Sequence, residues 1–396
     1  MICPSATNGI FIGASGEVRP CCKWRQEQDD YGWWGEVDDY SSVNSTLNSP
    51  YFKKLRKDLK DEIFPPGCRS CSGDEKNGIS SRRQRLISRI PDDGFLFELC
   101  LGNLCNFKCR MCNEVFSSSW IKDAMALGRP KHKGFVLSKK WIDEWLDYLE
   151  QIKGVIEIEL KGGEPFMHQH CEYFLIELSK LKNRDKIKID LITNGSHTPD
   201  WLPNVVDSVK KFVLKISIDG IGKVHEYIRG IECTWDEFYD NIQWYEEMAE
   251  ALPNLNLEHG FVVQNLNVHN MIETQKLLKN KITWQILNTP NQLQCNIMPE
   301  KSKQKILNTI PEYHDKPSYN RSYKQIRNEL KKYSKEVVKK KEIIVLNKID
   351  LVDQKELNKK IKFFENKTKK KVDILSNVDK KLISKLKSNL LGYVFK

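Results

Sequence analysis

Between residue 93 and about residue 299 the sequence alternates between short apolar runs and amphipathic stretches, and this alternation limits the possible folds. The apolar runs have the length and β-branched composition of buried strands, and helical spacing of apolar residues follows most of them. Strand candidates are 95–101, 155–160, 187–192, 212–218, 255–263, 284–287 and 294–297, and helix candidates are 137–152, 171–181, 235–249 and 271–279. About six parallel βα units predict an α/β fold, a partial (βα)6 TIM-like barrel.

The first strand candidate runs directly into three cysteines spaced C-x3-C-x2-C: Cys105, Cys109 and Cys112. Thiolates are preferred ligands of iron–sulfur clusters, and three of them leave one iron of a four-iron cluster open to a small molecule. A zinc knuckle and three reduced core cysteines are the alternatives. Zinc sites more often pair C-x2-C with a second, distant pair. The spacing therefore favours the cluster.

Polar motifs follow the later strand candidates at the edge where the cysteine loop is expected. In parallel barrels the carboxyl ends of the strands carry the functional residues. Glycine and asparagine also end strands for reasons of turn geometry, so each motif alone fits an ordinary turn. Their shared position indicates a site. The motifs are Gly162-Gly163-Glu164-Pro165, Thr193-Asn194-Gly195, Ser217-Ile218-Asp219-Gly220 and Gln264-Asn265-Leu266-Asn267.

Residues 1–92 form a second, irregular cysteine-rich module in this interpretation. Turn formers dominate it, 16–22 predicts a hairpin turn leading into a strand, and 49–60 predicts a helix. Its cysteines suit either structural zinc or a second iron–sulfur cluster. They are Cys3, Cys21, Cys22, Cys68 and Cys71.

Composition points to a reducing compartment. The chain has 12 cysteines, its start lacks the basic and apolar regions of a secretory signal, and no apolar run approaches the ~20 residues of a membrane span. We expect a cytoplasmic protein without a membrane partner, whose cysteines serve metal or redox chemistry.

These motifs together resemble those of the radical SAM superfamily. The resemblance implies that Cys105, Cys109 and Cys112 hold a [4Fe-4S] cluster whose open iron binds S-adenosylmethionine (SAM). It implies SAM contacts by Gly162, Gly163, Glu164, Pro165, Asn194, Ser217, Asp219 and Arg229, with Arg229 on the SAM carboxylate and Gln264 near the adenosine. The alternatives are an exposed helix-end charge for Arg229 and strand-capping roles for Asn194 and Gln264.

The N-terminal cysteines resemble the auxiliary-cluster module called SPASM or twitch. That module usually follows the radical SAM domain, whereas here it precedes it. The resemblance implies Cys3, Cys21, Cys68 and Cys71 as ligands of a second cluster, with Cys22 as the alternate.

The resemblance also implies the reaction. SAM is cleaved reductively and a 5′-deoxyadenosyl radical takes hydrogen from a substrate, with a peptide or protein as the default and a small molecule as the alternative. A flavodoxin- or ferredoxin-type donor supplies the electron. The competing hypothesis is a non-enzymatic, metal-stabilised binding protein.

The C-terminal residues 323–396 have a different composition. They hold 22 of the 64 basic residues and only 9 of the 53 acidic ones, so the remainder of the chain is close to neutral and offers no electrostatic case for nucleic-acid binding. Within them a strand candidate at 342–346 precedes Asn347-Lys348-Ile349-Asp350, and a helix is expected at 380–394.

This tail resembles the last third of the GTPase domain of Obg proteins, with Ser376-Asn377 where Ser-Ala is usual. No G-x4-G-K-S/T phosphate loop occurs in the chain, so we expect no GTP hydrolysis. The tail is then a truncated α/β fragment, joined by gene fusion or by faulty assembly of the gene, or a basic surface that contacts RNA or a ribosome. The expected domains are 1–92, 93–310, a linker at 311–322, and 323–396.

Overall fold

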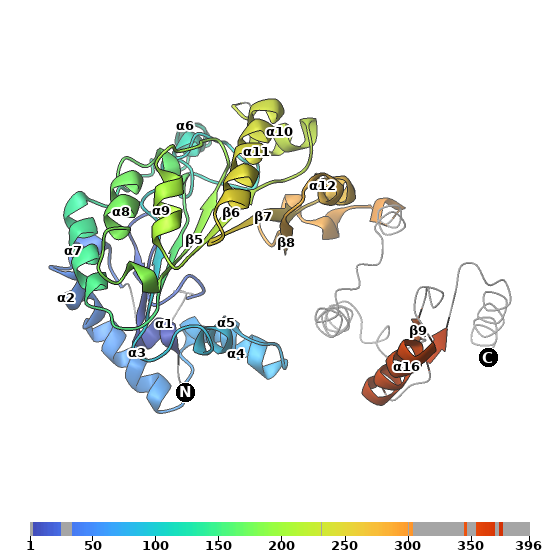
Figure 1. The fold of residues 1–396 in the computed structure, drawn as a ribbon, viewed down its shortest axis with the longest axis horizontal. Coiled ribbons are helices and arrows are strands. Elements are labelled where there is room, and N and C mark those ends of the chain that lie inside the picture. Colours follow the sequence, from blue (N-terminus) through green and yellow to red (C-terminus); the bar gives the residue numbers. More distant parts are fainter. Residues whose placement is uncertain are drawn as a thin grey trace. The chain divides into compact units, whose positions relative to one another are not determined.

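The computed structural model describes residues 3–24, 34–230, 232–299, 301–303, 344–346, 354–368 and 372–374. The chain divides into two compact units, Met1–Tyr313 and His314–Lys396. Each unit is described by itself, and Figure 1 gives the labels of their helices and strands.

The first unit contains an eight-stranded sheet in the order β2-β1-β3-β4-β5-β6-β7-β8. From β3 onward all neighbouring strands are parallel and follow the chain order. The sheet ends at β2 and β8, so it is open, and the partial barrel of six parallel strands is confirmed. These strands are β3 (Phe95–Leu99), β4 (Ile156–Leu160), β5 (Ile187–Thr193), β6 (Lys211–Ser217), β7 (Leu255–Val263) and β8 (Lys281–Ile286).

Alternation along the strands separates an apolar outer face from a polar inner face. In β5, Ile187, Ile189 and Leu191 are buried, while Lys188 and Asp190 between them are partly exposed. The outer face packs against helices; Trp145 of α7, for example, stacks on Phe97 at 4.3 Å between ring centroids. Figure 1 shows this helical layer along the outer side of the sheet, and it consists of α7 (Lys139–Glu150), α8 (Cys171–Leu178), α9 (Leu202–Ser208) and α11 (Trp235–Ala251).

Three short helices accompany the loops that follow the strands. They are α6 (Ile121–Ala126), α10 (Lys223–Arg229) and α12 (Met271–Leu277). The predicted helices at 137–152, 171–181, 235–249 and 271–279 are confirmed, with ends that shift by a few residues.

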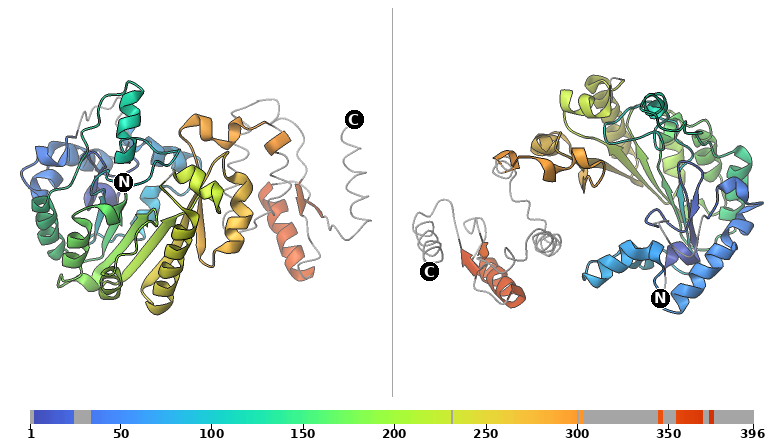
Figure 2. Two further views of the ribbon diagram at one scale, coloured as in Figure 1. Left: turned by 90° about the horizontal axis from the view of Figure 1, so that it is seen from above. Right: turned by 180° about the vertical axis from the view of Figure 1, so that it is seen from behind.

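The N-terminal part of the chain extends the same sheet. β1 (Gly9–Ile12) pairs in parallel with β3, and β2 (Val18–Arg19) closes an antiparallel hairpin on β1, as the turn at 16–22 predicts. The sequence reading missed β1, a run of only four residues. Figure 2 shows the blue helices of this part gathered near the N-terminus; they are α1 (Pro4–Thr7), α2 (Val43–Leu47), α3 (Pro50–Lys60), α4 (Arg69–Lys76) and α5 (Arg82–Ile87).

One predicted strand is wrong. Residues 294–297 form no strand; short 3₁₀ helices occupy Asn291–Leu293 and Cys295–Ile297. The backbone N of Gln294 donates to Asn291 O at 3.1 Å, and Met298 N donates to Cys295 O at 3.2 Å; a side-chain bond from Gln294 Nε2 to Asn291 Oδ1 at 3.0 Å adds to them. Such local side-chain and i+3 bonds satisfy the backbone without a neighbouring strand.

The second unit contains two parallel strands and one helix among its described residues. β9 (Ile344–Leu346) pairs with β10 (Val372–Ile374), and α16 (Gln354–Thr368) lies between them in sequence. The predicted strand at 342–346 is confirmed for its last three residues. The motif at 347–350, the pair at 376–377 and the expected helix at 380–394 lie outside the described residues. None of the helices described in either unit has the length and apolar character that crossing a bilayer requires.

Candidate metal and cofactor site

The three-cysteine loop lies at the carboxyl edge of the sheet, directly after β3. Cys105 and Cys109 are buried and Cys112 is half-buried. Burial raises the pKa of Cys105 to about 11, with Cys109 adding to the shift, and raises that of Cys112 to about 12, with Cys109 and Cys105 adding to it. The three thiols therefore lie close enough to repel one another as thiolates. Because metal ligands must be deprotonated, binding a metal here releases protons.

The serine-rich run after the loop holds its backbone in place. Ser119 Oγ donates to Cys105 O at 2.7 Å, Ser117 Oγ donates to Phe107 O at 2.7 Å, and Trp120 Nε1 donates to Cys109 O at 3.2 Å. The run forms a 3₁₀ turn, Ser118–Trp120, that leads into α6. Its contacts with the cysteine loop were not predicted.

Gly162 and Gly163 bring the loop after β4 against the start of the cysteine loop. Both have positive φ, +88° and +59°. A Cβ on Gly163 would lie 2.4 Å from Leu104 O, and one on Gly162 would lie 2.6 Å from Cys100 Sγ. The close approach lets Glu164 N donate to Leu104 O at 2.7 Å. These glycines are therefore required by contacts within the chain itself.

Glu164 connects the ends of β4 and β5. Its buried carboxylate accepts hydrogen bonds from Thr193 Oγ1 at 2.8 Å and from Asn194 N at 2.6 Å. Burial raises the pKa of Glu164 to about 7, although these hydrogen bonds oppose the shift. Pro165, next to it, is buried at the start of a 3₁₀ turn, Pro165–Met167.

Two amides, from the residues directly after β5 and β7, point to the cysteine loop. Asn194 Nδ2 donates to Asn106 Oδ1 at 2.8 Å and lies 3.9 Å from Cys105 Sγ. Gln264 is fully buried, and its Nε2 lies 3.8 Å from Met111 Sδ. The Oε1 atom of Gln264 has no partner in the described part of the chain, which leaves an acceptor at this edge for a bound group.

Arg229 lies at the end of α10 and is buried, which excludes an exposed helix-end charge. Its Nη2 pairs with Asp219 Oδ2 at 2.8 Å, and its Nη1 lies 3.8 Å from Cys109 Sγ. Burial raises the pKa of Asp219, and the charge of Arg229 counteracts that shift. Asp219 and Arg229 thus form a buried pair beside the cysteine loop, while Ser217, the last residue of β6, is half-buried nearby in sequence.

The backbone before Arg229 also supports the loop. Arg110 N donates to Ile228 O at 2.8 Å, and Arg110 Nε donates to Tyr227 O at 2.7 Å. The segment that supplies Arg229 therefore holds the middle of the cysteine loop.

His168 is a polar side chain of this edge that sequence reasoning missed. It follows the Gly162–Pro165 motif, is 5% exposed, and has no partner for either ring nitrogen among the described residues. Burial lowers its pKa to about 4, so the ring is neutral at pH 7. A Cβ on Gly102 would lie 2.7 Å from its Nε2. The two histidines at positions 168 and 170 were the sequence feature that could have pointed to it.

The N-terminal cysteines gather at a second place. Cys3, Cys21, Cys68 and Cys71 line one pocket, whose wall also includes Arg82 and Arg83. Burial raises the pKa of Cys3 and of Cys21, and repulsion from Cys71 adds to the shift at Cys3. Cys22 instead packs with Phe11, Ala14 and Cys100.

Helix α4 and a glycine explain how this pocket forms. Cys68 is the N-cap residue of α4 and Cys71 lies in its first turn, so the C-x2-C spacing places both on one side of the helix. A Cβ on Gly67 would lie 2.4 Å from the ring of Trp24. The absence of a side chain at Gly67 thus lets Trp24 pack against the segment that leads into Cys68 and keeps the segment of Cys21 beside it.

Both donor sets suit iron–sulfur clusters. In the described part of the chain no three Cys, His, Asp or Glu side chains converge on a single metal-ion position; the four N-terminal thiols stand around a pocket instead. Iron–sulfur clusters are ligated by cysteine thiolates. Both places supply cysteines: the loop at the carboxyl edge of the sheet, here called the rim, and the N-terminal pocket.

The open parallel sheet with a cysteine loop at its carboxyl edge defines the class: a partial-barrel protein with the ligand set of an iron–sulfur cluster. Residues 99–259 match the radical SAM superfamily and residues 3–72 match SPASM, an iron–sulfur cluster-binding domain. These two matches identify a radical SAM-type region that is preceded in the sequence by a SPASM-type region. These domains imply a [4Fe-4S] cluster with SAM and at least one further cluster.

Solved structures of low similarity include a crystal structure of Streptococcus suis SuiB bound to SAM. It is 14% identical, with 87% of this chain and 55% of that chain covered and a TM-score of 0.35. Native anSMEcpe with bound SAM is 17% identical, with 48% and 51% covered and a TM-score of 0.38.

A short segment of this chain is similar to curated Obg GTPases, in agreement with the resemblance predicted for the tail. GTPase Obg of Pelagibacter ubique is 48% identical over 73 residues, which are 18% of this chain and 22% of that protein. GTPase Obg of Ehrlichia chaffeensis is 41% identical over 75 residues, which are 19% and 22%. The chain spans less than a quarter of the length of these two relatives.

Proposed function

We propose that this protein is a radical SAM enzyme that cleaves SAM reductively and abstracts hydrogen from a peptide or protein substrate. The observation that carries the proposal is the geometry of this edge. Cys105, Cys109 and Cys112 lie on one loop, and Asn194, Gln264 and Arg229, which come from the segments after β5, β7 and β6, are directed to it. The peptide is the substrate class that the SPASM resemblance implies.

The residues of the rim would hold and orient the cofactors. The three thiolates would ligate a [4Fe-4S] cluster, which when bound supplies the electron that cleaves the sulfonium bond of SAM. Arg229 places a positive charge beside Cys109 and so favours its thiolate, since burial alone raises the pKa of Cys109. Gln264 Oε1 has no partner among the described residues and would accept a hydrogen bond from SAM, and Ser217 lies at the same edge. Glu164 is occupied by Thr193 and Asn194, so we assign it to positioning the loop.

The pocket of Cys3, Cys21, Cys68 and Cys71 would hold the second cluster. Cys22 lies outside the residues that line this pocket and is not needed as a ligand. A second cluster would bind substrate or accept an electron from the product radical. A flavodoxin- or ferredoxin-type protein in the cytoplasm would be the electron donor.

We assign residues 1–92 and 93–310 to the SPASM and radical SAM parts, 311–322 to a linker and 323–396 to the Obg-like fragment. The fragment would not hydrolyse GTP, because the sequence lacks the loop that cradles phosphates. Phosphate release from GTP by the full-length protein should not exceed that of buffer alone; GTP-dependent phosphate release above that background would contradict this assignment.

Metal content and SAM cleavage test the proposal together. Protein purified without oxygen and supplied with iron and sulfide should hold about eight irons and no zinc. With dithionite and SAM it should release 5′-deoxyadenosine, and the Cys105→Ala/Cys109→Ala/Cys112→Ala variant should release none. Zinc in place of iron, or an iron-loaded protein that never cleaves SAM, would sink the proposal. About four irons would leave the rim cluster alone and remove the second.

A further inference from the structure

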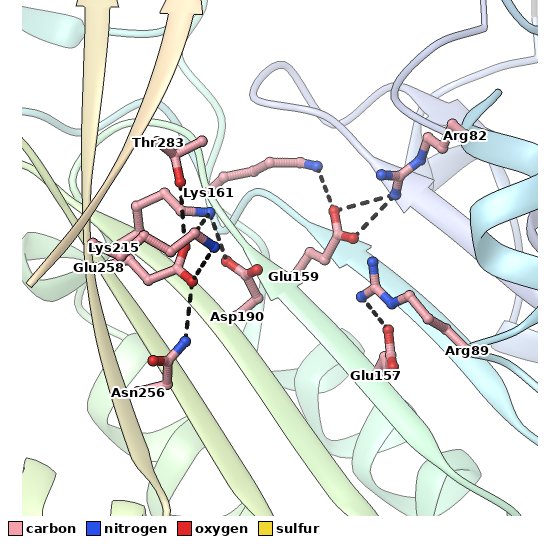
Figure 3. Close-up of polar contacts among 11 residues, drawn as sticks. Arg82, Arg89, Glu157, Glu159, Lys161, Asp190, Lys215, Asn256, Glu258 and Thr283 are labelled. Atoms are coloured by element: carbon pink, nitrogen blue, oxygen red, sulfur yellow. Dashed lines mark hydrogen bonds and ion pairs between the residues drawn. The ribbon is translucent and has the colours of Figure 1, made fainter. Parts of the chain in front are cut away.

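Four charged side chains between the two cysteine sites form a closed set of ion pairs, here called the charge bridge: Arg82, Glu98, Glu159 and Lys161. Arg82 Nη2 lies 3.1 Å from both Glu98 Oε1 and Glu159 Oε1. Lys161 Nζ lies 2.8 Å from Glu98 Oε2 and 3.1 Å from Glu159 Oε2. Each cation therefore contacts both carboxylates. Figure 3 shows Arg82 and Lys161 meeting at Glu159 above the inner face of the sheet.

The strand register explains why these cations are needed. Glu98 of β3 is directly opposite Glu159 of β4, and Glu159 is directly opposite Asp190 of β5. Like charges directly opposite each other destabilise a sheet, and the side chain of Glu98 has no exposed surface. Burial raises the pKa of Glu159, but the charges of Lys161 and Arg82 outweigh it and lower that pKa to about 2. Glu159 therefore stays ionised because the cations are present.

One end of the bridge belongs to the pocket of the N-terminal cysteines. Arg82 lines that pocket together with Cys3, Cys21 and Cys71. Its Nε is buried and has no partner in the part of the chain that the structure describes. The bridge also contacts the backbone beside Cys21, because Cys22 N donates to Glu98 Oε1 at 3.4 Å.

The other end of the bridge belongs to the rim. Lys161 immediately precedes Gly162, and its backbone N donates to Leu99 O at 3.0 Å, at the end of the strand that leads into the cysteine loop. The bridge thus extends from the wall of the N-terminal cysteine pocket to the end of β3, the strand that leads into the three-cysteine loop.

We propose that the charge bridge sets the reduction potential of a cluster in the N-terminal pocket, with Arg82 as the residue that acts on it. This rests on the proposed second cluster. Reduction adds negative charge to a cluster, so a nearby cation favours the reduced form and a nearby anion disfavours it. As built, the bridge has two cations and two carboxylates and is neutral. Removing one member therefore leaves a net charge on the bridge, which contacts the pocket through Arg82, and the sign of that charge depends on the member removed.

The experiment uses the full-length chain with the rim cysteines replaced, Cys105→Ala/Cys109→Ala/Cys112→Ala, so that only the second cluster contributes a signal. Its midpoint potential is measured by redox titration followed by electron paramagnetic resonance. In this background Arg82→Gln leaves an excess negative charge and should lower the potential, whereas Glu98→Gln leaves an excess positive charge and should raise it. Lys161→Gln should lower it by less than Arg82→Gln.

Arg89→Gln is the matched control. Arg89 also pairs with a carboxylate of β4, Glu157, but its side chain is 45% exposed and it does not line the pocket. Its removal should leave the potential unchanged. Arg82→Lys should restore most of the wild-type value. If Arg82→Gln fails to hold iron, the Glu98 and Lys161 variants still decide the sign.

The outcomes separate the two proposals. A wild-type protein that holds only the rim cluster overturns the second cluster and the charge bridge together. A protein with both clusters, in which the Arg82, Lys161 and Glu98 variants shift the potential in the same direction or not at all, retains the proposed function and overturns the role of the bridge.

Discussion

The two cysteine sites are built in opposite ways. Cys105, Cys109 and Cys112 occupy eight consecutive residues after a single strand, and the rest of the barrel supplies hydrogen bonds to that loop. Cys3, Cys21, Cys68 and Cys71 come from three separate segments and meet only in the pocket beside α4. The first is a local motif supported by tertiary contacts, and the second exists only through them.

The difference teaches that two sites with the same chemistry have different sensitivities. A local loop keeps its ligands near one another even when its surroundings loosen. A site made of distant segments pays loop-closure entropy that packing has to offset. We therefore expect the rim site to depend on individual supporting contacts and the pocket site to depend on the packing that brings its segments together.

The largest effect should come from removing each set of ligands. Replacing Cys105, Cys109 and Cys112 by alanine should abolish SAM cleavage and remove about four irons. Replacing Cys3, Cys21, Cys68 and Cys71 should remove a similar amount of iron, yet leave uncoupled SAM cleavage in place. Iron analysis and 5′-deoxyadenosine release measure both. Cys22→Ala is the control and should retain all the iron. A rim variant that still cleaves SAM would break the distinction between the sites.

The buried pair beside the rim loop should give the next largest effect. Arg229→Met leaves Asp219 without its cation in a fully buried position, and breaking such a pair costs roughly 3–5 kcal/mol. Urea unfolding of the metal-free protein measures the loss. Asp219→Leu combined with Arg229→Met should recover part of it, because no charge is then left unpaired. If Arg229→Met alone is as stable as the wild type, the Asp219–Arg229 pair does not contribute to the free energy of unfolding.

Acid should act on the barrel through histidine. All eight histidines follow residue 92, so the N-terminal module has none. His259 of β7 is fully buried, and burial lowers its pKa from 6.5 to about 4. Its stabilising contribution is complete above pH 6.5 and is lost as the pH falls through 4, a change of roughly 3 kcal/mol.

The free energy of unfolding measured between pH 7 and pH 4 tests this expectation. His259→Leu should lose less stability over that range than the wild type. His269→Leu, at an exposed position, is the matched control and should follow the wild type. Equal acid sensitivity of His259→Leu and wild type would contradict the assignment.

Two glycines should give a smaller and site-selective effect. A methyl group on Gly163 meets Leu104 O, and one on Gly67 meets the Trp24 ring. Each alanine substitution should cost roughly 1–3 kcal/mol by overpacking. Gly163→Ala should weaken iron binding at the rim only, and Gly67→Ala at the pocket only. The control is Gly128→Ala, since Gly128 has positive φ but open space around it, and it should cost about 1 kcal/mol. If either variant loses iron from both sites, the rim site and the pocket site do not bind iron independently of each other.

The sequence predicted the barrel well because its strands are long and apolar and its helices have clear periodicity. It missed β1, since four residues give too short a pattern, and it placed a strand at 294–297 where local hydrogen bonds favour 3₁₀ turns. Periodicity reports which face of an element is buried, and it becomes uninformative when an element is shorter than about two repeats.

The candidate site shows the same division. The spacing of Cys105, Cys109 and Cys112 and the glycines of the next strand end were visible in the text of the sequence. The partners of those residues were not: Glu164 is held by Thr193 and Asn194, and Arg229 by Asp219. His168 was missed because the short run His168-Gln169-His170 does not by itself predict a function, and only its burial without a partner among the described residues makes it notable.

The sequence by itself determined the parallel barrel, the three-cysteine loop and the change of composition at the tail, because each is a contiguous pattern in the chain. Only the tertiary structure decided which N-terminal cysteines share a pocket, that Cys22 lies apart from them, and that the charge bridge joins the two sites. Those arrangements depend on strand register and on contacts between distant segments. Register places Glu98 opposite Glu159, and a helix from elsewhere in the chain brings Arg82 to both.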